Sequence, residues 1–551
     1  MPSKLARYIP LLIISLLTIF ISFNFFNLTG MYTTHDGDFH LVRSLHFLSE
    51  LKHGQFPVRV APDLAFSHGY LAFQFFYPLP YYVVAIFQLL GISTTLSWKI
   101  MQILITFASL SVFYIWTRKS FDTKSALTAT AIYALVPFRF LTLYVTGQIG
   151  GYFGLFFASV VFLGIHNTLR SKSKFTGPLL ALGIAGLITS HLLSIILFFL
   201  PLVGYTLILL KEKFAIEKFK SLARWSLVGV GLSSFYLFPF LFEKQWVKIG
   251  NQVLVEYTDH WPTLKQLIYS PWGYGSSVNT VLDGMSFQIG LALIASLSIS
   301  LLLTLIKKKK MTVATYFIFC LLVMVFLMLE FSAPVWKLLT PLQLIQYPWR
   351  LLAVTTLLGS WLTAWLIHNL KGRAQWLAIV LLLVVAVYNV RNYTKPWPLG
   401  WKTDFDYTAN TSLFYGSTDI SWELMPITTT GAPNKKPESL ILIDESQVTI
   451  SHFAKTNSGA TRYTADISAK GNSQLNILIW DLPIWEVRVN GIVQEKQRAE
   501  DGTILVPITE SSKSLEIILK KTNLQIISDL LSLICLLYIA KTLLFQKQLR
   551  T

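Results

Sequence analysis

The sequence contains few cysteines and few charged residues. Its 551 residues include only two cysteines, Cys320 and Cys535, and each lies inside an apolar run. This pattern indicates neither a disulfide framework nor a cysteine metal site. Charged residues make up 13% of the chain, whereas 53% of the residues are hydrophobic and the mean hydropathy is +0.54. Such a balance excludes an ordinary soluble domain and predicts a protein that crosses the membrane many times.

The excess of positive charge does not point to nucleic acid. The formal net charge is +18, but the basic residues fall in short clusters between apolar runs, as membrane orientation requires. About twelve apolar runs are long enough, or nearly so, to cross a bilayer. These runs are residues 9–29, 98–117, 124–143, 150–168, 176–190, 191–210, 222–242, 287–306, 311–330, 350–369, 375–391 and 524–544.

The basic clusters predict the orientation of the chain. They fall at every second connection between the runs, beginning with Lys4 and Arg7 and ending with Lys541, Lys547 and Arg550. The other clusters are Arg118, Lys119 and Lys124, then Arg170, Lys172 and Lys174, then Lys211, Lys213, Lys218, Lys220 and Arg224, then residues 307–310, and then Lys371 and Arg373. We therefore expect both termini on the cytoplasmic side of the cytoplasmic membrane.

The number of predicted spans and their orientation depend on one short apolar stretch. Residues 78–91 would place the basic clusters on alternating sides if they formed a span, so we interpret them as an interfacial helix on the outer surface. A short true span is the alternative.

The first run, residues 8–28, is too long for a signal peptide core and lacks a small-residue cleavage site after it, so we expect it to remain as a helix.

The outer side then receives four segments, namely residues 30–97, 243–286, 331–349 and 392–523. The last is less hydrophobic and contains alternating patterns such as QLNILIW, WEVRVNG and SLEIILKK. Alternation of this kind is typical of strands, and the Asn490-Gly491 pair favours a hairpin turn.

The domain organisation follows from these segments. We expect an all-α membrane domain over residues 1–391 and an extracytoplasmic β-sandwich domain over residues 392–523. A final span and a cytoplasmic tail follow over residues 524–551. All of the candidate functional residues lie on the predicted outer side. We expect the catalytic residues in the first outer loop, residues 30–97.

The densest polar motif is TTHDGDFHLVR, residues 33–43. Asp36 and Asp38 are separated by Gly37, whose backbone freedom lets both carboxylates converge on one divalent cation, such as Mg²⁺ or Mn²⁺, or on one hydroxyl. Such a pair is suited to metal binding or to general-base catalysis. The alternative is that one of them caps a helix, FHLVRSLHFLSELKHG, whose apolar stripe predicts that it lies flat on the outer leaflet.

Three neighbours of the aspartates, His35, His40 and Arg43, are further candidates for the site. The two histidines could act as metal ligands or proton carriers. A histidine at a membrane interface is also often an ordinary amphipathic surface residue.

Further polar groups lie near the outer ends of predicted spans. They are Arg139 in PFRF, Gln148 in TGQIGG, His191 in TSHLL, and Gln346 and Arg350 in QYPWRLL. Ionisable residues at such depth are costly and tend to line a cavity or to be paired. A guanidinium fork could clamp a phosphate, whereas snorkelling or a structural ion pair is the alternative for each arginine.

The outer loop over residues 256–277 mixes aromatic residues with acidic residues and a histidine. Glu256 and Tyr257 open it. This composition can stack on sugar rings and bind their hydroxyls, although anchoring at a membrane interface would produce similar aromatic residues.

Several of these motifs resemble a known family. HDGDFHLVR, GYLAFQFFYPLPYY, YALVPFRF, QYPWRLL and WDLPIWEVRVNG look like the bacterial membrane proteins labelled 6-pyruvoyl-tetrahydropterin-synthase-related, and like those of the YfhO type. The amino-terminal third resembles the GT-C superfamily of multi-span glycosyltransferases. The metal-binding histidines of a pterin enzyme have no counterpart here, so the pterin label does not indicate the function.

The resemblance implies transfer of a sugar from a polyprenyl-phosphate carrier to an envelope glycan or glycolipid at the outer face of the membrane. Asp36 stands at the superfamily's acidic position in the first loop, and Asp38 completes the pair. One departure is that relatives often carry an arginine and a glutamate where this chain reads TGQIGG, so a different acceptor or a lack of activity stays open. The expected mechanism is an inverting displacement with Asp36 as the base and Arg350 or Arg139 on the phosphate.

Two other functions fit the sequence less well. A transporter or flippase of lipid-linked saccharides would account for the number of spans, but transporters usually show internal repeats, and we find no such symmetry. A scaffold could instead bind envelope glycans through its β domain without catalysis.

Overall fold

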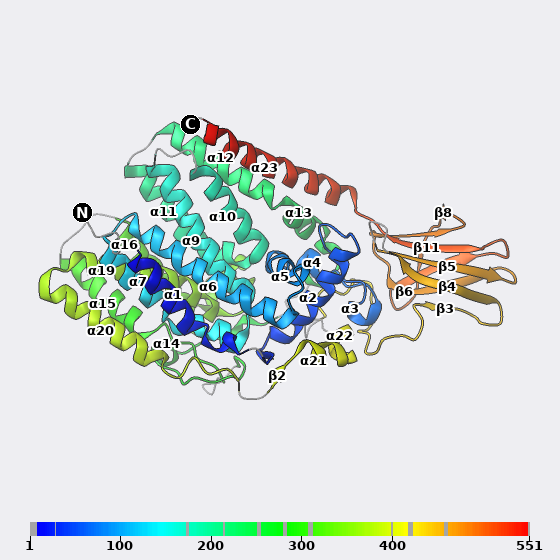
Figure 1. The fold of residues 1–551 in the computed structure, drawn as a ribbon, viewed down its shortest axis with the longest axis horizontal. Coiled ribbons are helices and arrows are strands. Elements are labelled where there is room, and N and C mark those ends of the chain that lie inside the picture. The colour runs from blue at the N-terminus through cyan, green and yellow to red at the C-terminus, as the bar shows by residue number, and fades with distance from the viewer. Residues whose placement is uncertain are drawn as a thin grey trace.

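The computed structural model places a helical bundle at one end of the molecule and β strands at the other (Figure 1). It describes residues 8–548, except for residue 28 and residues 172–175, 213–214, 251–254, 279–283, 307–311, 398–399, 417–421 and 457–460. Helix α1 begins and α23 ends on the side of the bundle away from the strands (Figure 1). This arrangement agrees with the expectation that both termini lie on one side, while the orientation in the membrane stays a prediction.

Among the described residues, six helices are long and apolar enough to cross a membrane. They are α6 (Thr94–Arg118), α9 (Ile149–Arg170), α11 (Leu193–Glu212), the continuous stretch of η8 (Pro348–Leu351) and α19 (Leu352–Asn369), α20 (Gly372–Val390), and α23 (Asn523–Gln548). At about 1.5 Å per residue, each is close to or longer than the hydrocarbon thickness of a bilayer.

Three further pairs of helices qualify together but are bent at a short break. The pairs are α7 (Thr123–Ala134) with α8 (Pro137–Leu141) and η3 (Thr142–Thr146); α12 (Ile216–Leu232) with α13 (Ser234–Glu243) and η4 (Lys244–Trp246); and α16 (Val313–Leu327) with η7 (Glu330–Ser332) and α17 (Ala333–Leu338). The bends are 42°, 71° and 99°. Pro137 explains the first break, because its ring restrains the preceding residue to an extended backbone conformation.

The described residues therefore contain six to nine candidate spans, which confirms a polytopic helical membrane domain. The sequence-based number of about twelve also counts α1 (Ile9–Ile21), α10 (Thr176–Ser190) and α15 (Leu291–Ile306), which are shorter, so that number stays a prediction. Helix α5 (Leu79–Leu89) covers most of the stretch that we interpreted as interfacial, and its 11 residues are too few to cross a bilayer.

The remaining helices are shorter and lie mostly in the segments that the sequence predicts on the outer side. In addition to α2 (Gly37–Lys52), they are η2 (Phe23–Phe26), α3 (Leu64–Ser67), α4 (Ala72–Phe75), η5 (Lys248–Gly250), η6 (Tyr257–Asp259), α14 (Leu264–Ile268), α18 (Thr340–Gln343), α21 (Asp404–Ala409) and α22 (Thr411–Gly416).

The C-terminal region forms two antiparallel sheets, as the alternating patterns predicted. One has the order β3 (Ile441–Leu442), β6 (Ser473–Trp480), β10 (Thr503–Ile508) and β9 (Gln497–Arg498). The other has the order β4 (Val448–Thr456), β5 (Arg462–Ala469), β11 (Ser514–Leu519), β7 (Trp485–Val489) and β8 (Ile492–Val493). Asn490 and Gly491 both have positive φ between the paired strands β7 and β8, which confirms the predicted hairpin. The packing of the sheets as a sandwich stays a prediction.

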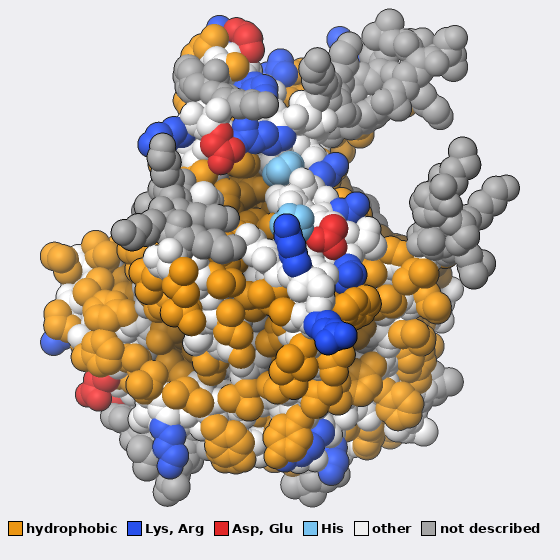
Figure 2. Space-filling view, turned by 90° about the vertical axis from the view of Figure 1, so that its left-hand side faces the viewer, with side chains coloured by type: hydrophobic (Ala, Val, Ile, Leu, Met, Phe, Trp, Pro, Cys, Tyr) orange, Lys and Arg blue, Asp and Glu red, His pale blue; other side chains and the backbone are white. Residues whose placement is uncertain are grey.

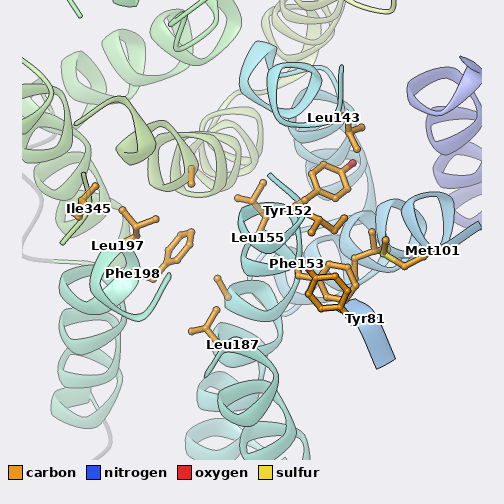
Figure 3. Packing of buried hydrophobic residues seen from close by; sticks show 14 of the residues in the cluster. Tyr81, Met101, Leu143, Tyr152, Phe153, Leu155, Leu187, Leu197, Phe198 and Ile345 are labelled. Atoms are coloured by element: carbon orange, nitrogen blue, oxygen red, sulfur yellow. The ribbon is translucent and has the colours of Figure 1, made fainter. Parts of the chain in front are cut away.

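Aromatic and aliphatic side chains fill the helical core. Figure 3 shows Tyr81 of α5, Met101 of α6, and Tyr152 and Phe153 of α9 among these buried residues. The outside of the bundle is also apolar, and α23 exposes Ile527, Ile534 and Leu537 among others. Figure 2, a view onto the end away from the strands, shows broad hydrophobic areas beside a stripe of Lys and Arg side chains. A surface of this kind is typical of a protein in contact with lipid.

Helix α2 does not lie flat on a leaflet, so that expectation was wrong. Protein covers most of it, and its buried side chains include the polar residues Arg43, His46 and Glu50. These residues can be buried because each finds a partner: Arg43 lies between aromatic rings, His46 bonds to a carbonyl oxygen, and Glu50 bonds to a lysine of β4. A two-residue strand, β1 (Met31–Tyr32), pairs with β2 (Trp401–Lys402) and brings residues 401–416 beside α2.

Candidate active site

The turn before α2 is fixed to the turn before α9. The backbone amides of His35 and Asp36 donate to the carbonyl oxygens of Val145 at 2.9 Å and Thr146 at 3.0 Å. Gly147 follows with a φ of +66°, and a Cβ atom there would overlap the hydroxyl of Thr34. The motif HDGD and the motif TGQIGG are therefore held together, and Gly147 is required by both its backbone angle and the close approach.

Asp36 occupies the position just before α2, but its side chain does not cap the helix. The amide of Gly37 donates instead to the hydroxyl of Thr34 at 2.9 Å, and no hydrogen bond to the Asp36 carboxylate is found within the described ranges. The Asp36 side chain is partly exposed. The capping interpretation is thus not what the structure shows, and the carboxylate can interact with another group.

The surroundings of Asp36 make it more basic than an ordinary aspartate. Burial raises the pKa of its carboxyl from 3.8 to about 6, and the charges of Arg350, His35 and Arg43 oppose that rise. A carboxylate with a pKa near 6 is still mostly ionised at neutral pH and accepts a proton more readily than an exposed aspartate does.

Arg350 is held in a defined orientation close to Asp36. Its Nη1 atom donates to the carbonyl oxygen of Ile345 at 2.9 Å and to Oε1 of Gln346 at 2.8 Å, and the guanidinium carbon lies 4.6 Å from the ring centroid of Tyr347. Gln346 has a φ of +65°, a left-handed conformation that is unfavourable for a residue with a side chain. Strain of this kind is concentrated at functional sites.

Two aromatic residues complete this side of the site. His191 lies in the break between α10 and α11, where its Nδ1 atom bonds to the hydroxyl of Ser194 at 2.7 Å. The ring of Tyr77 is 5.9 Å from the ring of His191. Gly150 permits this approach, because a Cβ atom there would lie 2.6 Å from Tyr77 Cζ.

Electrostatic interactions link Arg350 to His191, Tyr77 and Asp36, so these four residues form one cluster.

Asp38 belongs to a different set of contacts. Its carboxylate pairs with Lys402 and accepts a hydrogen bond from the hydroxyl of Tyr407 at 3.1 Å. Asp38 therefore ties α2 to the segment that contains β2 and α21. The structure separates the roles of the two aspartates, which the sequence treated as a pair.

The divalent cation expected at the two aspartates stays a prediction, and the described residues offer few ligands for it. No group of three or more His, Cys, Asp or Glu side chains suited to a metal ion occurs in the part of the chain that the structure describes. The Asp38 carboxylate is also neutralised by Lys402, which leaves Asp36 without a second carboxylate to share an ion.

His40 and Arg43 are buried residues of α2 that pack next to the candidate site. His40 is buried, with Nδ1 2.7 Å from the hydroxyl of Tyr81, and burial together with the charge of Arg43 lowers the pKa of its imidazole. The guanidinium of Arg43 lies 4.6 Å from the ring centroid of Phe39 and 4.5 Å from that of Phe76. A neutral histidine and a fixed positive charge thus lie on the buried side of α2, within two turns of Asp36.

Arg139 is not brought to the cluster. It is fully buried between Tyr133 and Tyr152, and it donates to the Tyr133 carbonyl oxygen, the Tyr152 hydroxyl and the Ser109 hydroxyl. Gln148, by contrast, follows Gly147 at the start of α9, in the turn that fixes the Asp36 backbone.

Glu256 and Tyr257 lie away from this cluster. Tyr257 is buried with its ring 5.2 Å from that of Trp336, and Glu256 is exposed. Neither has a contact with Asp36 or Arg350 among the described residues.

The sequence did not predict three residues of the site, Tyr77, Lys402 and Tyr407. Only Tyr77 had a local signal, because it lies in the FYPLPYY motif.

Comparison with known proteins gives one family and several distant similarities. Residues 73–395 match the family described as "6-pyruvoyl-tetrahydropterin synthase related domain; membrane protein". An uncharacterized protein of Lactococcus lactis subsp. cremoris (strain MG1363) is 27% identical over 241 residues, which span 42% of this chain and 39% of that protein.

The solved structures that align with the fold include an arabinofuranosyltransferase and an oligosaccharyltransferase. The arabinofuranosyltransferase AftD from Mycobacteria aligns with 70% of this chain and 27% of its own, at 14% identity and a TM-score of 0.48. The oligosaccharyltransferase of Archaeoglobus fulgidus, solved as a complex with Zn and sulfate, aligns with 75% of this chain and 54% of its own, at 12% identity and a TM-score of 0.38. This chain thus matches only part of each of these larger proteins.

Proposed function

The chain belongs to the family of 6-pyruvoyl-tetrahydropterin synthase-related membrane proteins, and from this premise and the site geometry we propose that it is a membrane glycosyltransferase. It transfers a sugar from a polyprenyl-phosphate carrier to an envelope glycan or glycolipid. The reaction takes place at the outer face of the cytoplasmic membrane, with both termini in the cytoplasm.

One observation carries the proposal: the Asp36 carboxylate, whose pKa burial raises to about 6, lies within electrostatic reach of the oriented guanidinium of Arg350. Sugar transfer from a lipid phosphate needs a base for the acceptor hydroxyl and a cation for the leaving phosphate. Asp36 and Arg350 supply these two groups in one cluster.

The proposed step is an inverting displacement. An Asp36 carboxylate oxygen takes the proton of the acceptor hydroxyl while that oxygen attacks the anomeric carbon. The bond between the anomeric carbon and the phosphate oxygen breaks, and the electron pair leaves with the polyprenyl phosphate. Arg350 stabilises the charge on this phosphate, since a guanidinium suits phosphate geometry and is already oriented by Ile345 and Gln346.

The test measures sugar transfer by the purified protein in detergent, with radiolabelled polyprenyl-phosphate hexoses as donors. General-base help is worth roughly a hundred- to ten-thousand-fold, so Asp36→Asn should reduce transfer by that amount. Glu445→Gln changes an exposed acid near the β strands and serves as the matched control. Transfer by Asp36→Asn at the wild-type rate would refute the assignment.

One observation favours a second function, the transport of lipid-linked saccharides. Three helix pairs are bent by more than 40° at short breaks, and broken helices are a feature of transporters. The same detergent assay separates the two functions, because detergent leaves no sealed compartments. Sugar release in detergent supports catalysis, whereas activity that requires sealed vesicles supports transport.

A further inference from the structure

A cleft of about 450 Å³ opens between the start of α2 and the segment of α21 and α22. One wall holds His35, Asp38 and Phe39, and the other holds Lys402, Asn410 and Ser412. This volume lies within the range of roughly 300–1,000 Å³ that is typical of small-molecule sites. The cleft is therefore large enough for one or a few sugar rings.

The cleft borders the turn that carries Asp36. His35 precedes Asp36 in the sequence, and Asp38 follows it by two residues, so the cleft lies beside the turn that carries the candidate base, and the Asp36 side chain itself is not among the lining residues. Arg350, Tyr77 and His191 do not line it in the part of the chain that the structure describes. A molecule in the cleft would thus approach Asp36 by a different route from a group held by Arg350.

The chemistry of the walls suits a neutral molecule with many hydroxyls. Asp38 and Lys402 compensate each other's charge, Asn410 and Ser412 add an amide and a hydroxyl, and Phe39 adds an apolar surface. Sugar hydroxyls both donate and accept hydrogen bonds, while the C–H faces of the ring pack on apolar groups. A phosphate is disfavoured, because Asp38 already neutralises Lys402, the lining residue that would otherwise attract it.

We propose that this cleft binds the saccharide end of the acceptor and presents its attacking hydroxyl to Asp36. The role in the reaction rests on the proposed function, whereas saccharide binding is measurable without turnover. In this arrangement, residues 401–416 determine which acceptor is used.

The test measures binding to the full chain in nanodiscs by fluorescence anisotropy. The probe is a fluorophore-labelled pool of oligosaccharides released by mild acid from the envelope of the source cells. Ser412→Trp places an indole in the cleft and should weaken binding at least tenfold. Thr411→Trp introduces the same side chain at the neighbouring exposed position outside the lining, and it should bind as the wild type does.

The outcomes separate this inference from the proposed function. Asp36→Asn should bind the oligosaccharides with the wild-type Kd while failing in transfer. Equal binding by Ser412→Trp and the wild type, or no binding by the wild type, would overturn the cleft assignment. Wild-type transfer by Asp36→Asn would overturn the catalytic role of Asp36 without affecting the binding result. If Ser412→Trp does not fold, Ser412→Leu fills the cleft with a smaller side chain and gives the same comparison.

Discussion

Asp36 shows how the position of one carboxylate determines its chemistry. Asp36 and Asp38 are separated by a single glycine, yet Asp38 is neutralised by Lys402 whereas burial raises the pKa of Asp36 to about 6. The first residue is thereby suited to accept a proton and the second to hold two segments together. Sequence alone could identify the pair but could not assign these different roles.

The raised pKa of Asp36 predicts the pH dependence of transfer. The base acts in its ionised form, so kcat/KM should be constant above a pH of about 7 and fall about tenfold per pH unit below about 6. An aspartate with the ordinary pKa of 3.8 would leave the rate unchanged over this range. The measurement is the rate of transfer between pH 4.5 and 8, with Glu445→Gln as the control, and a flat profile above pH 5 would contradict the role of Asp36.

The backbone strain at Gln346 predicts that replacing this residue changes stability and activity in different ways. Gln346→Gly removes the left-handed penalty, so its free energy of unfolding should exceed that of Gln346→Ala by about 1 kcal/mol. It also removes the oxygen that orients Arg350, so kcat should fall by roughly tenfold to a hundredfold. Gln346→Ala loses the same oxygen and keeps the strain, so its activity should fall without the gain in stability. Equal thermal stability of the two variants would contradict this explanation.

At the scale of elements, the N-terminus of α6 is capped from a distant segment. The carboxylate of Asp404 accepts hydrogen bonds from the amides of Thr94 at 2.6 Å and Thr95 at 2.9 Å. Asp404→Ala should lower the free energy of unfolding by about 1–2 kcal/mol, since both the cap and the favourable helix-dipole interaction are lost. Asp406→Ala disturbs only the short helix α21 and should cost less. Thermal unfolding in detergent measures both, and equal losses would contradict the capping role.

Glu50 connects α2 to the β strands. Its carboxylate is 1% exposed and accepts hydrogen bonds from Lys455 at 3.1 Å, from Thr461 and from Gln55 at 3.2 Å. Lys455→Met leaves a buried charge without its counter-ion and should cost about 3–5 kcal/mol. The double variant Glu50→Gln with Lys455→Met should be more stable than Lys455→Met alone. Strictly additive losses in this cycle would show that the pair is not coupled.

Local patterns predicted the elements better than their contacts. Apolar runs identified the helices, and the Asn490-Gly491 pair identified the β7–β8 hairpin, because both signals depend on neighbouring residues. The flat position of α2 was predicted wrongly, because its apolar stripe contacts other protein segments rather than lipid. Lys402, the partner of Asp38, is 364 positions away, and no spacing rule within one sequence can reveal such a pair.

The candidate site was predicted in part for the same reason. Asp36 was selected from the Asp-Gly-Asp motif, whereas His191, Gln346 and Arg350 were selected as polar residues near predicted outer ends of spans. The structure places these four residues in or beside one cluster. Arg139 was selected by the same argument but is enclosed by aromatic rings, because burial depends on neighbours that the sequence does not show.

At the scale of the whole molecule, the cluster lies where the helical bundle meets the segments that the sequence predicts on the outer side. Arg350 and His191 come from ends of bundle helices, and Asp36 comes from the turn before α2. The cleft lies between the start of α2 and residues 401–416. This arrangement suits a reaction in which a donor arrives from the membrane and an acceptor arrives from outside. The central claim is that Asp36 and Arg350 act on the same lipid-linked sugar.

The most direct measurement is a cryo-EM structure of the full chain with a non-hydrolysable polyprenyl-phosphonate sugar. We expect the phosphonate within about 3 Å of the Arg350 guanidinium, and Asp36 on the opposite face of the anomeric carbon with room for one acceptor hydroxyl between them. A phosphonate bound away from Arg350, or an anomeric carbon that Asp36 cannot reach through one hydroxyl, would contradict the claim.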